Sequence, residues 1–331
     1  MFDLRLDEAA DWIISRGYAR VALQFPEGLK SKAIEVSRRL SERTGASFFI
    51  VGDPCYGACD IFEYRGTADA LVHFGHSPIP SQGDDPDVMY VEAFYEGDIG
   101  SHVSAIADSL PHKVGLMATV QYVPGIKRAR EVLEAAGKEV LVSGGDARIL
   151  CPGQALGCNS SAMPGEAEHI LFIGEGDFHP LAAALGTDVE VTVLNPITGE
   201  HRRIADLKDR LLRRRFAAIE RARSAQRYLI VVCSKKGQDR TALADSVIRK
   251  AVSAGKEAYK VRMTEIGPDA LSVYADADVY VITGCPRIAL DDSARYSKPV
   301  LTPPEAEIAL GLRNWDDYII DEIRSPQSGL K

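Results

Sequence analysis

A pattern of short apolar strands and amphipathic helices recurs three times along this chain of 331 residues. In each pass an apolar strand is followed by a turn, a helix, a glycine and further apolar strands. The four residues Ala-Gly-Lys-Glu at 136–139 return letter for letter at 254–257. The strands that this pattern predicts are 21–25, 47–51, 70–75, 114–117, 139–142, 170–174, 229–233 and 279–282. We therefore predict a triplicated unit.

Apolar residues between the strands repeat at helical spacing. In the first unit Leu29, Ala33, Val36 and Leu40 fall on one helical face, and Gly45 is placed to end that helix. Strands that alternate with such helices favour mainly parallel sheets with helices outside them. The predicted fold class is α/β, with three repeated α/β domains around one shared central site. The expected domains are 1–97, 98–200 and 201–331, and the third begins with a linking helix.

Each predicted unit carries at least one cysteine in a turn that contains glycine. Cys59 lies in the turn 52–60, Cys158 in 153–158 and Cys285 in 284–287. All three turns follow predicted strands, and parallel sheets collect their ligands beyond the carboxyl ends of the strands. We therefore expect three distant thiolates to converge on one metal site among the domains.

The composition of the chain limits the classes of protein and the cellular compartment that fit it. The chain is 46% hydrophobic and 26% charged, and it contains no apolar run near the roughly 18 residues needed to cross a bilayer. A net charge of -8 argues against binding to nucleic acid. The first residues lack the apolar core of a secretory signal, so we expect a cytoplasmic protein. In that compartment six cysteines are more often ligands, catalytic groups or buried thiols than disulfides.

The residues alone leave several kinds of thiol site open. Structural zinc prefers closely spaced ligand pairs, and only Cys55 and Cys59 approach such a pair. A catalytic zinc could combine a cysteine with His73, His76 or His179. A nucleophilic cysteine is a further alternative, although no base is singled out. A four-iron, four-sulfur (4Fe-4S) cluster on three thiolates would leave one iron open to a substrate. Cys233, inside an apolar strand, fits a small buried side chain.

Five longer motifs resemble one family along almost the whole chain. They are Tyr-Gly-Ala-Cys at 56–59, Val-His-Phe-Gly-His-Ser at 72–77, Gly-Gln-Ala-Leu-Gly-Cys at 153–158, Cys-Pro-Arg-Ile-Ala-Leu-Asp at 285–291 and Leu-Thr-Pro-Pro-Glu-Ala at 301–306. In this order they resemble the radical enzymes of diphthamide biosynthesis, in particular their single-protein archaeal form. The resemblance implies a homodimer in which three similar domains each give one cysteine to a 4Fe-4S cluster. Matched by motif, the metal ligands are Cys59, Cys158 and Cys285, whereas Cys55 and Cys151 fall outside the set.

The resemblance also implies a reaction. The family uses S-adenosylmethionine as cosubstrate and cleaves the bond between its sulfur and γ-carbon, which leaves 5'-methylthioadenosine. A 3-amino-3-carboxypropyl radical then adds to C2 of a histidine imidazole on translation elongation factor 2, with electrons from an unidentified donor. One alternative is a non-catalytic electron-delivery subunit of the same pathway, and another is a zinc-dependent hydrolase. The presence of all three cysteines favours the catalytic enzyme.

Further residues are candidates for contact with the cosubstrate. The turn after the first strand of each unit can bind a carboxylate or a ribose through backbone N–H groups at a helix start. Gln154 stands beside Cys158, His76 and Asp291 flank the expected centre, and Asp177 follows a glycine-rich strand end. Helix capping and turn formation would explain the residues of these first-strand turns equally well. Gln154 could instead orient its loop, His76 could be a structural histidine and Asp177 a turn residue. The predicted contacts are Glu27, Gly28, His76, Gln121, Gln154, Asp177, Gly237, Gln238 and Asp291.

The arginine-rich stretch 201–227 separates the second and third units. Its apolar residues follow helical spacing, which predicts a long linking helix with a solvated basic face. Docking of an acidic protein partner on that face is the alternative.

Overall fold

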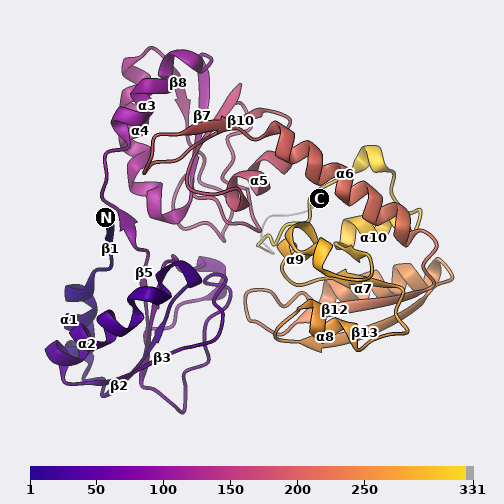
Figure 1. Ribbon diagram of the computed structural model, residues 1–331, viewed down its shortest axis with the longest axis horizontal. Coiled ribbons are helices and arrows are strands. Elements are labelled where there is room, and N and C mark those ends of the chain that lie inside the picture. Colours follow the sequence, from indigo (N-terminus) through magenta and orange to yellow (C-terminus); the bar gives the residue numbers. More distant parts are fainter. Residues whose placement is uncertain (326–331) are drawn as a thin grey trace.

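The computed structural model describes residues 1–325 and contains three main β-sheets, one in each of three lobes (Figure 1). The first lobe holds a sheet with the strand order β3-β2-β4-β5. All of its neighbouring strands are parallel. Its strands are β2 (Arg20–Gln24), β3 (Ser47–Ile50), β4 (Ala70–Phe74) and β5 (Val88–Val91).

The second and third sheets repeat this arrangement. The second has the order β11-β10-β9-β7-β8, with β11 antiparallel at its edge, and the third has β13-β12-β14-β15. The second sheet contains β7 (Lys113–Ala118), β8 (Glu139–Leu141), β9 (His169–Ile173), β10 (Glu190–Leu194) and β11 (His201–Arg203). The third contains β12 (Arg227–Cys233), β13 (Glu257–Met263), β14 (Val279–Ile282) and β15 (Val300–Leu301).

Counted within each unit, the strands of all three sheets lie in the order second, first, third, fourth. The expected α/β class with mainly parallel sheets is therefore confirmed. The fourth strands, β5, β10 and β15, are absent from the sequence pattern described above. The common strand order supports the proposed triplication, while the boundaries at 97 and 200 remain predictions. The last six residues of the third predicted domain lie outside the described part of the chain.

One acidic residue in each unit joins the starts of the first and third strands. It directly precedes the third strand and accepts a hydrogen bond from the backbone N–H of the first residue of the first strand. The pairs are Asp69 with Arg20 at 2.8 Å, Glu168 with Lys113 at 3.2 Å and Asp278 with Arg227 at 2.8 Å. This recurring contact is a second feature that the three units share.

The helices cover the sheets largely as the apolar spacing predicts. In α2, Ala33, Val36 and Leu40 are buried, and the helix ends at Gly45 with a left-handed φ of 70°. In the first lobe the rings of Phe25 and Phe74 stack at 4.5 Å in the core. The α-helices are α1 (Leu6–Arg16), α2 (Ala33–Thr44), α3 (Gly100–Ile106), α4 (Val123–Ala135), α5 (Phe178–Leu185), α6 (Ala205–Ala222), α7 (Thr241–Ser253), α8 (Pro268–Ser272), α9 (Arg287–Asp291) and α10 (Pro303–Ala309). None of the helices in the described residues is both long and apolar enough to cross a membrane.

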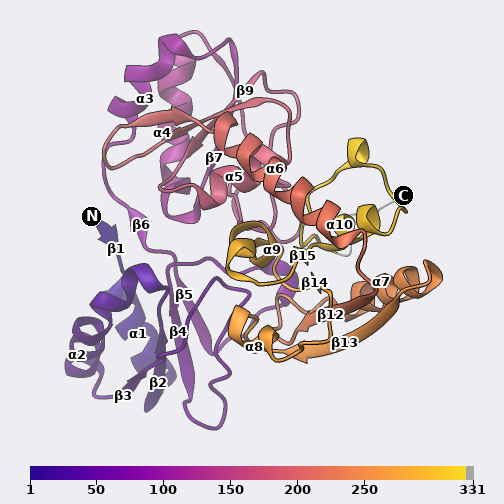
Figure 2. The same ribbon diagram turned by 45° about the vertical axis from the view of Figure 1, so that its right-hand side comes forward.

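Two elements connect the lobes. Strand β1 (Phe2–Asp3) pairs antiparallel with β6 (Phe94–Tyr95) beside the link between the first and second lobes (Figure 2). Helix α6 runs from the second lobe to the third (Figure 1).

The prediction that the basic face of α6 is solvated is only partly right. Arg213 and Arg214 are exposed, but Arg215 is fully buried and forms an ion pair of 2.6 Å with Glu305 of α10. The Arg215 guanidinium also donates hydrogen bonds to two backbone carbonyl groups of the third lobe. A buried charge needs such partners, so Arg215 fixes the linking helix to the third sheet.

Candidate metal centre

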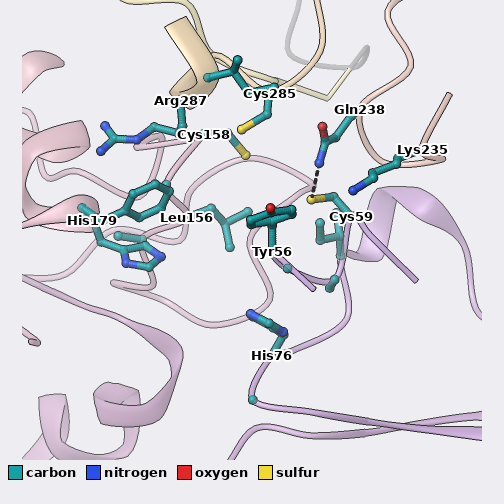
Figure 3. Close-up of a pocket in the computed structure, with 18 of the residues that line it drawn as sticks. Tyr56, Cys59, His76, Leu156, Cys158, His179, Lys235, Gln238, Cys285 and Arg287 are labelled. Atoms are coloured by element: carbon teal, nitrogen blue, oxygen red, sulfur yellow. Dashed lines mark hydrogen bonds between the residues drawn. The ribbon is translucent and has the colours of Figure 1, made fainter. Parts of the chain in front are cut away.

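A cavity of about 440 Å³ lies where the three units meet, and Cys59, Cys158 and Cys285 all line it. Every lining segment lies at or beyond the carboxyl end of a strand, in agreement with the general rule for parallel sheets. Cys233, the last residue of β12, is a fourth cysteine in the lining. Figure 3 shows the side chains of Cys158 and Cys285 pointing toward each other, with Cys59 on the same side of the cavity. The structure thus brings together three cysteines that are far apart in the chain.

Cys59 lies in the turn after β3 and contacts the third unit. The Gln238 amide donates a hydrogen bond of 3.3 Å to Sγ of Cys59. The backbone N–H of Gly237 donates another, also of 3.3 Å, to the carbonyl oxygen of Cys59. A Cβ atom on Gly237 would lie 2.4 Å from Cβ of Cys59, so this approach requires glycine. Burial and the neighbouring Cys158 raise the pKa of Cys59 to about 12.

Cys158 lies in the long loop between β8 and β9. Its carbonyl oxygen accepts a hydrogen bond of 2.8 Å from the backbone of Ile323, so the C-terminal segment holds this loop. Burial raises the pKa of the Cys158 thiol, while the positive charges of Arg148 and Arg240 favour its thiolate form. Arg240 is itself fixed by an ion pair of 2.6 Å with Asp321.

Cys285 follows β14 and immediately precedes α9. Its carbonyl oxygen accepts a hydrogen bond of 3.2 Å from the N–H of Ile288, in the first turn of that helix. Burial, followed by the neighbouring thiols Cys158 and Cys59, raises the pKa of Cys285 above its usual range. Three thiolates in one cavity repel one another, which raises the free energy of their charged form. A bound cation would remove this repulsion.

Arg287 is the most unusual charged residue in the cavity wall. Its side chain is 5% exposed, and its Nε atom lies 2.8 Å from the Asp291 carboxylate. The guanidinium packs against the Phe178 ring, with 4.1 Å between Cζ and the ring centroid. Its Nη1 atom has no hydrogen-bond partner among residues 1–325. An unpaired buried donor at a cavity suggests a place for an acidic group of a ligand.

The predicted cosubstrate contacts divide into two groups. His76, Gln121, Gln154, Gln238 and Asp291 line the cavity together with the cysteines. The lining, within the described residues, does not include Glu27, Gly28, Asp177 or Gly237. Glu27 is exposed and forms an ion pair of 2.6 Å with Lys30, and the exposed Asp177 is paired with Arg202. A role of these four residues in binding the cosubstrate remains a prediction.

Two of the lining glutamines connect the first and second units. The Gln121 amide donates a hydrogen bond of 2.6 Å to the carbonyl oxygen of Gly75. The Gln154 amide donates one of 2.7 Å to the Ser77 hydroxyl. Both amides therefore stabilise the junction after β4, which sequence spacing could not reveal because it does not report contacts between units.

Sequence reasoning assigned no role to Arg148, Lys235 or Arg287. Lys235 is nearly buried and forms an ion pair of 2.8 Å with Asp60, next to Cys59 in the chain. The sequence signal for Arg287 was its place two residues after Cys285 and four before Asp291, which is helical pairing distance. Arg148 lies in an irregular loop, where no periodic pattern identifies a buried cation.

Three mainly parallel sheets, each bringing at least one cysteine to a shared buried cavity, form the arrangement expected of a protein that binds a thiolate-ligated metal group. The family model described as putative diphthamide synthesis protein matches residues 25–320, and this chain belongs to that family. The resemblance inferred from the sequence motifs is thereby confirmed.

Named relatives agree with this assignment. The chain is 37% identical to the 2-(3-amino-3-carboxypropyl)histidine synthase of Pyrococcus horikoshii, over 93% of this chain and 90% of that protein. It is 30% identical to subunit 1 of the corresponding Homo sapiens enzyme, over 92% of this chain and 71% of that subunit. The crystal structure of Dph2 from Pyrococcus horikoshii with a 4Fe-4S cluster superposes with a TM-score of 0.89 at 35% identity. That similarity covers 98% of this chain and 95% of the Dph2 chain.

Proposed function

We propose that this protein transfers a 3-amino-3-carboxypropyl group from S-adenosylmethionine to C2 of a histidine imidazole on translation elongation factor 2, with release of 5'-methylthioadenosine. The observation that carries the proposal is the convergence of Cys59, Cys158 and Cys285 in one cavity. A relative with the same fold holds a 4Fe-4S cluster, and two relatives are named for the product of this transfer.

The residues around the cysteines fit such a cluster. Thiolates are the preferred protein ligands of iron–sulfur clusters, and three of them leave one iron without a protein ligand. Arg148, Arg240 and Arg287 supply positive charge near the thiols, and the Gln238 amide donates to Cys59. When bound there, the cluster would supply the electron that cleaves the bond between sulfur and the γ-carbon.

Arg287 is the proposed anchor for the cosubstrate. The unpartnered Nη1 can donate to the carboxylate of the methionine part, while Asp291 and Phe178 hold the guanidinium in place. A fixed carboxylate also fixes the adjoining carbon chain, and orientation decides which of the three sulfonium bonds reacts.

Two neutral imidazoles also suit a cationic cosubstrate. Burial lowers the pKa of His76 to about 4, and burial next to Arg287 lowers that of His179 to about 3. Both lining rings are therefore uncharged at neutral pH and do not repel the sulfonium ion. Tyr56, Leu156 and Phe178 contribute apolar surface to the same wall, which limits the access of water.

The protein partners belong to the same proposal. The transfer needs an electron donor and the elongation factor, and the family resemblance adds a homodimer in the cytoplasm. Two other functions would give different results: an electron-delivery subunit would hold the cluster without forming product, and a hydrolase would hold zinc.

The products of the reaction test this function. Anaerobically reconstituted, reduced protein should convert S-adenosylmethionine to 5'-methylthioadenosine and add one 3-amino-3-carboxypropyl group to a histidine of elongation factor 2. Cys158→Ala should abolish both products, whereas Cys233→Ala should retain them. Formation of 5'-deoxyadenosine as the main product would contradict the proposed choice of bond.

A further inference from the structure

A second group of metal-ligating side chains lies beside the three-cysteine centre. Sγ of Cys55 and ring nitrogens of His73 and His76 all lie within 4.8 Å of one another. Cys55 comes from the same turn as Cys59, and His73 and His76 come from β4 and its carboxyl end. Cys55 is 3% exposed and His73 is fully buried, whereas His76 also lines the cavity. None of the three belongs to the proposed cluster ligands.

The hydrogen bonds around His73 fix which of its nitrogens can bind a metal. Its Nδ1 lies 2.9 Å from Oε1 of Gln24, an atom that only accepts hydrogen bonds, so Nδ1 carries the proton. The orientation of the Gln24 amide is set by its Nε2, which donates to the carbonyl oxygen of Asp60 at 2.8 Å. The Nε2 atom of His73 is therefore left with a free lone pair, 3.0 Å from Nδ1 of His76.

This arrangement is that of a metal-ligating histidine. Such a histidine usually donates its second ring N–H to a carbonyl or carboxylate oxygen, which orients the ring and selects the tautomer. Gln24 does this for His73 from the neighbouring strand β2. In the metal-free form, the short distance between the rings is explained by a hydrogen bond from His76 Nδ1–H to His73 Nε2.

We propose that Cys55, His73 and His76 form a second, mononuclear metal site for a divalent ion of the zinc class. One thiolate and two imidazoles suit zinc, and three protein ligands leave the fourth tetrahedral position to water. On binding, the Cys55 thiol loses its proton to solvent, and the His76 proton moves from Nδ1 to Nε2. The ion would tie the turn that carries Cys59 to the end of β4. This inference does not depend on the proposed transferase function.

Cobalt(II) is a suitable probe because its visible spectrum reports tetrahedral geometry and its near-ultraviolet charge-transfer band reports bound sulfur. The full-length, tag-free triple variant Cys59→Ala/Cys158→Ala/Cys285→Ala removes the thiols of the main centre. We expect it to bind one cobalt ion per chain with both spectral features. Adding Cys55→Ala should remove the sulfur band and weaken cobalt binding by at least about 100-fold. Loss of a group that only orients a metal ligand by a hydrogen bond already lowers metal affinity by about 10- to 100-fold.

Cys151→Ala, added to the same triple variant, is the matched control. Cys151 is a partly buried thiol that, like Cys55, precedes a cluster cysteine in the chain, and its removal should leave the cobalt spectrum unchanged. Gln24→Leu should weaken binding by about 10- to 100-fold while the sulfur band is kept. If circular dichroism shows that the Cys55 variant is unfolded, His76→Asn should weaken cobalt binding by at least about 100-fold while the sulfur band is kept. Absence of stoichiometric cobalt binding in the triple variant, or equal binding without Cys55, would overturn the proposal.

Discussion

Gly237 of the third unit lies directly against Cys59 of the first, and a Cβ atom at position 237 would lie 2.5 Å from Cα of Cys59. The obstacle is backbone and cannot be relieved by rotating a side chain. The position of this cysteine is therefore set by a contact between units as well as by its own turn.

Gly237→Ala should displace the Cys59 turn. We expect a loss of about 1–3 kcal/mol in the free energy of unfolding, the usual cost of overpacking, and a clear fall in bound iron and sulfide after reconstitution. Gly28→Ala is the matched control, because Gly28 lies in the corresponding turn of the first unit and has open space around it. Urea unfolding and metal analysis measure both effects. Normal iron content in Gly237→Ala would show that the contact is not needed.

Arg287→Met should weaken binding of S-adenosylmethionine. Hydrogen bonds to charged groups contribute about 1.5–3 kcal/mol, which corresponds to a roughly 10- to 150-fold higher Kd. Asp291→Asn, which keeps the guanidinium, is the control and should bind with a smaller loss. Equilibrium binding measured on reconstituted protein decides the matter, and an unchanged Kd in Arg287→Met would remove Arg287 from the cosubstrate site.

Arg215→Met should destabilise the third unit strongly. The substitution leaves Glu305 buried without its partner, and breaking a buried ion pair in this way costs about 3–5 kcal/mol. Arg214→Met changes the neighbouring exposed arginine, and its free energy of unfolding should stay within about 0.5 kcal/mol of the wild-type value. Urea unfolding compares the two variants. Equal stability would contradict the role of Arg215 in fixing α6.

The contribution of Asp278 to stability should depend on pH. Hydrogen bonds from Arg227 lower the pKa of this carboxyl to about 2 in the folded protein, against about 3.9 in an unfolded chain. A carboxyl whose pKa is lower in the folded state stabilises the folded protein at pH values above its unfolded-state pKa. This stabilisation is lost as the pH falls toward 2.

Because Asp278 is partly exposed, solvent screening reduces the effect to about 1 kcal/mol. Asp278→Asn should therefore be less stable than the wild type by about this amount at pH 7, and the difference should shrink below about pH 4. Asp276→Asn removes a fully exposed carboxylate near the same arginine and serves as the control. A difference between Asp278→Asn and the wild type that does not change with pH would contradict this assignment.

The sequence was most informative where physical constraints are local. The apolar runs of β2, β4, β9, β12 and β14 and the helical faces are repeated patterns, so the α/β class and the positions of the three cysteines after strands followed from them. The two-residue strand β15 has too few residues to show a period, and β5 has only four residues, although a turn rich in glycine, aspartate and proline precedes it.

Contacts between units were the part that the sequence could not provide. Gln121, Gln154 and Gln238 line the cavity, and each also has its amide in a hydrogen bond to the first unit that no sequence pattern indicated. Arg148 reaches the carbonyl oxygen of Gly237 at 3.5 Å, across a distance in the chain that no periodic pattern spans. Such pairs become visible only when the lobes are placed together.

The iron content of single cysteine variants tests the central claim most directly. Anaerobically reconstituted wild-type protein should hold about four iron and four sulfide per chain and give the electron paramagnetic resonance signal of a reduced 4Fe-4S cluster. Cys59→Ala, Cys158→Ala and Cys285→Ala should each lose most of that cluster, whereas Cys151→Ala and Cys233→Ala should keep it. A colourless wild-type protein that contains zinc after reconstitution, or three variants that all keep a full cluster, would contradict the account.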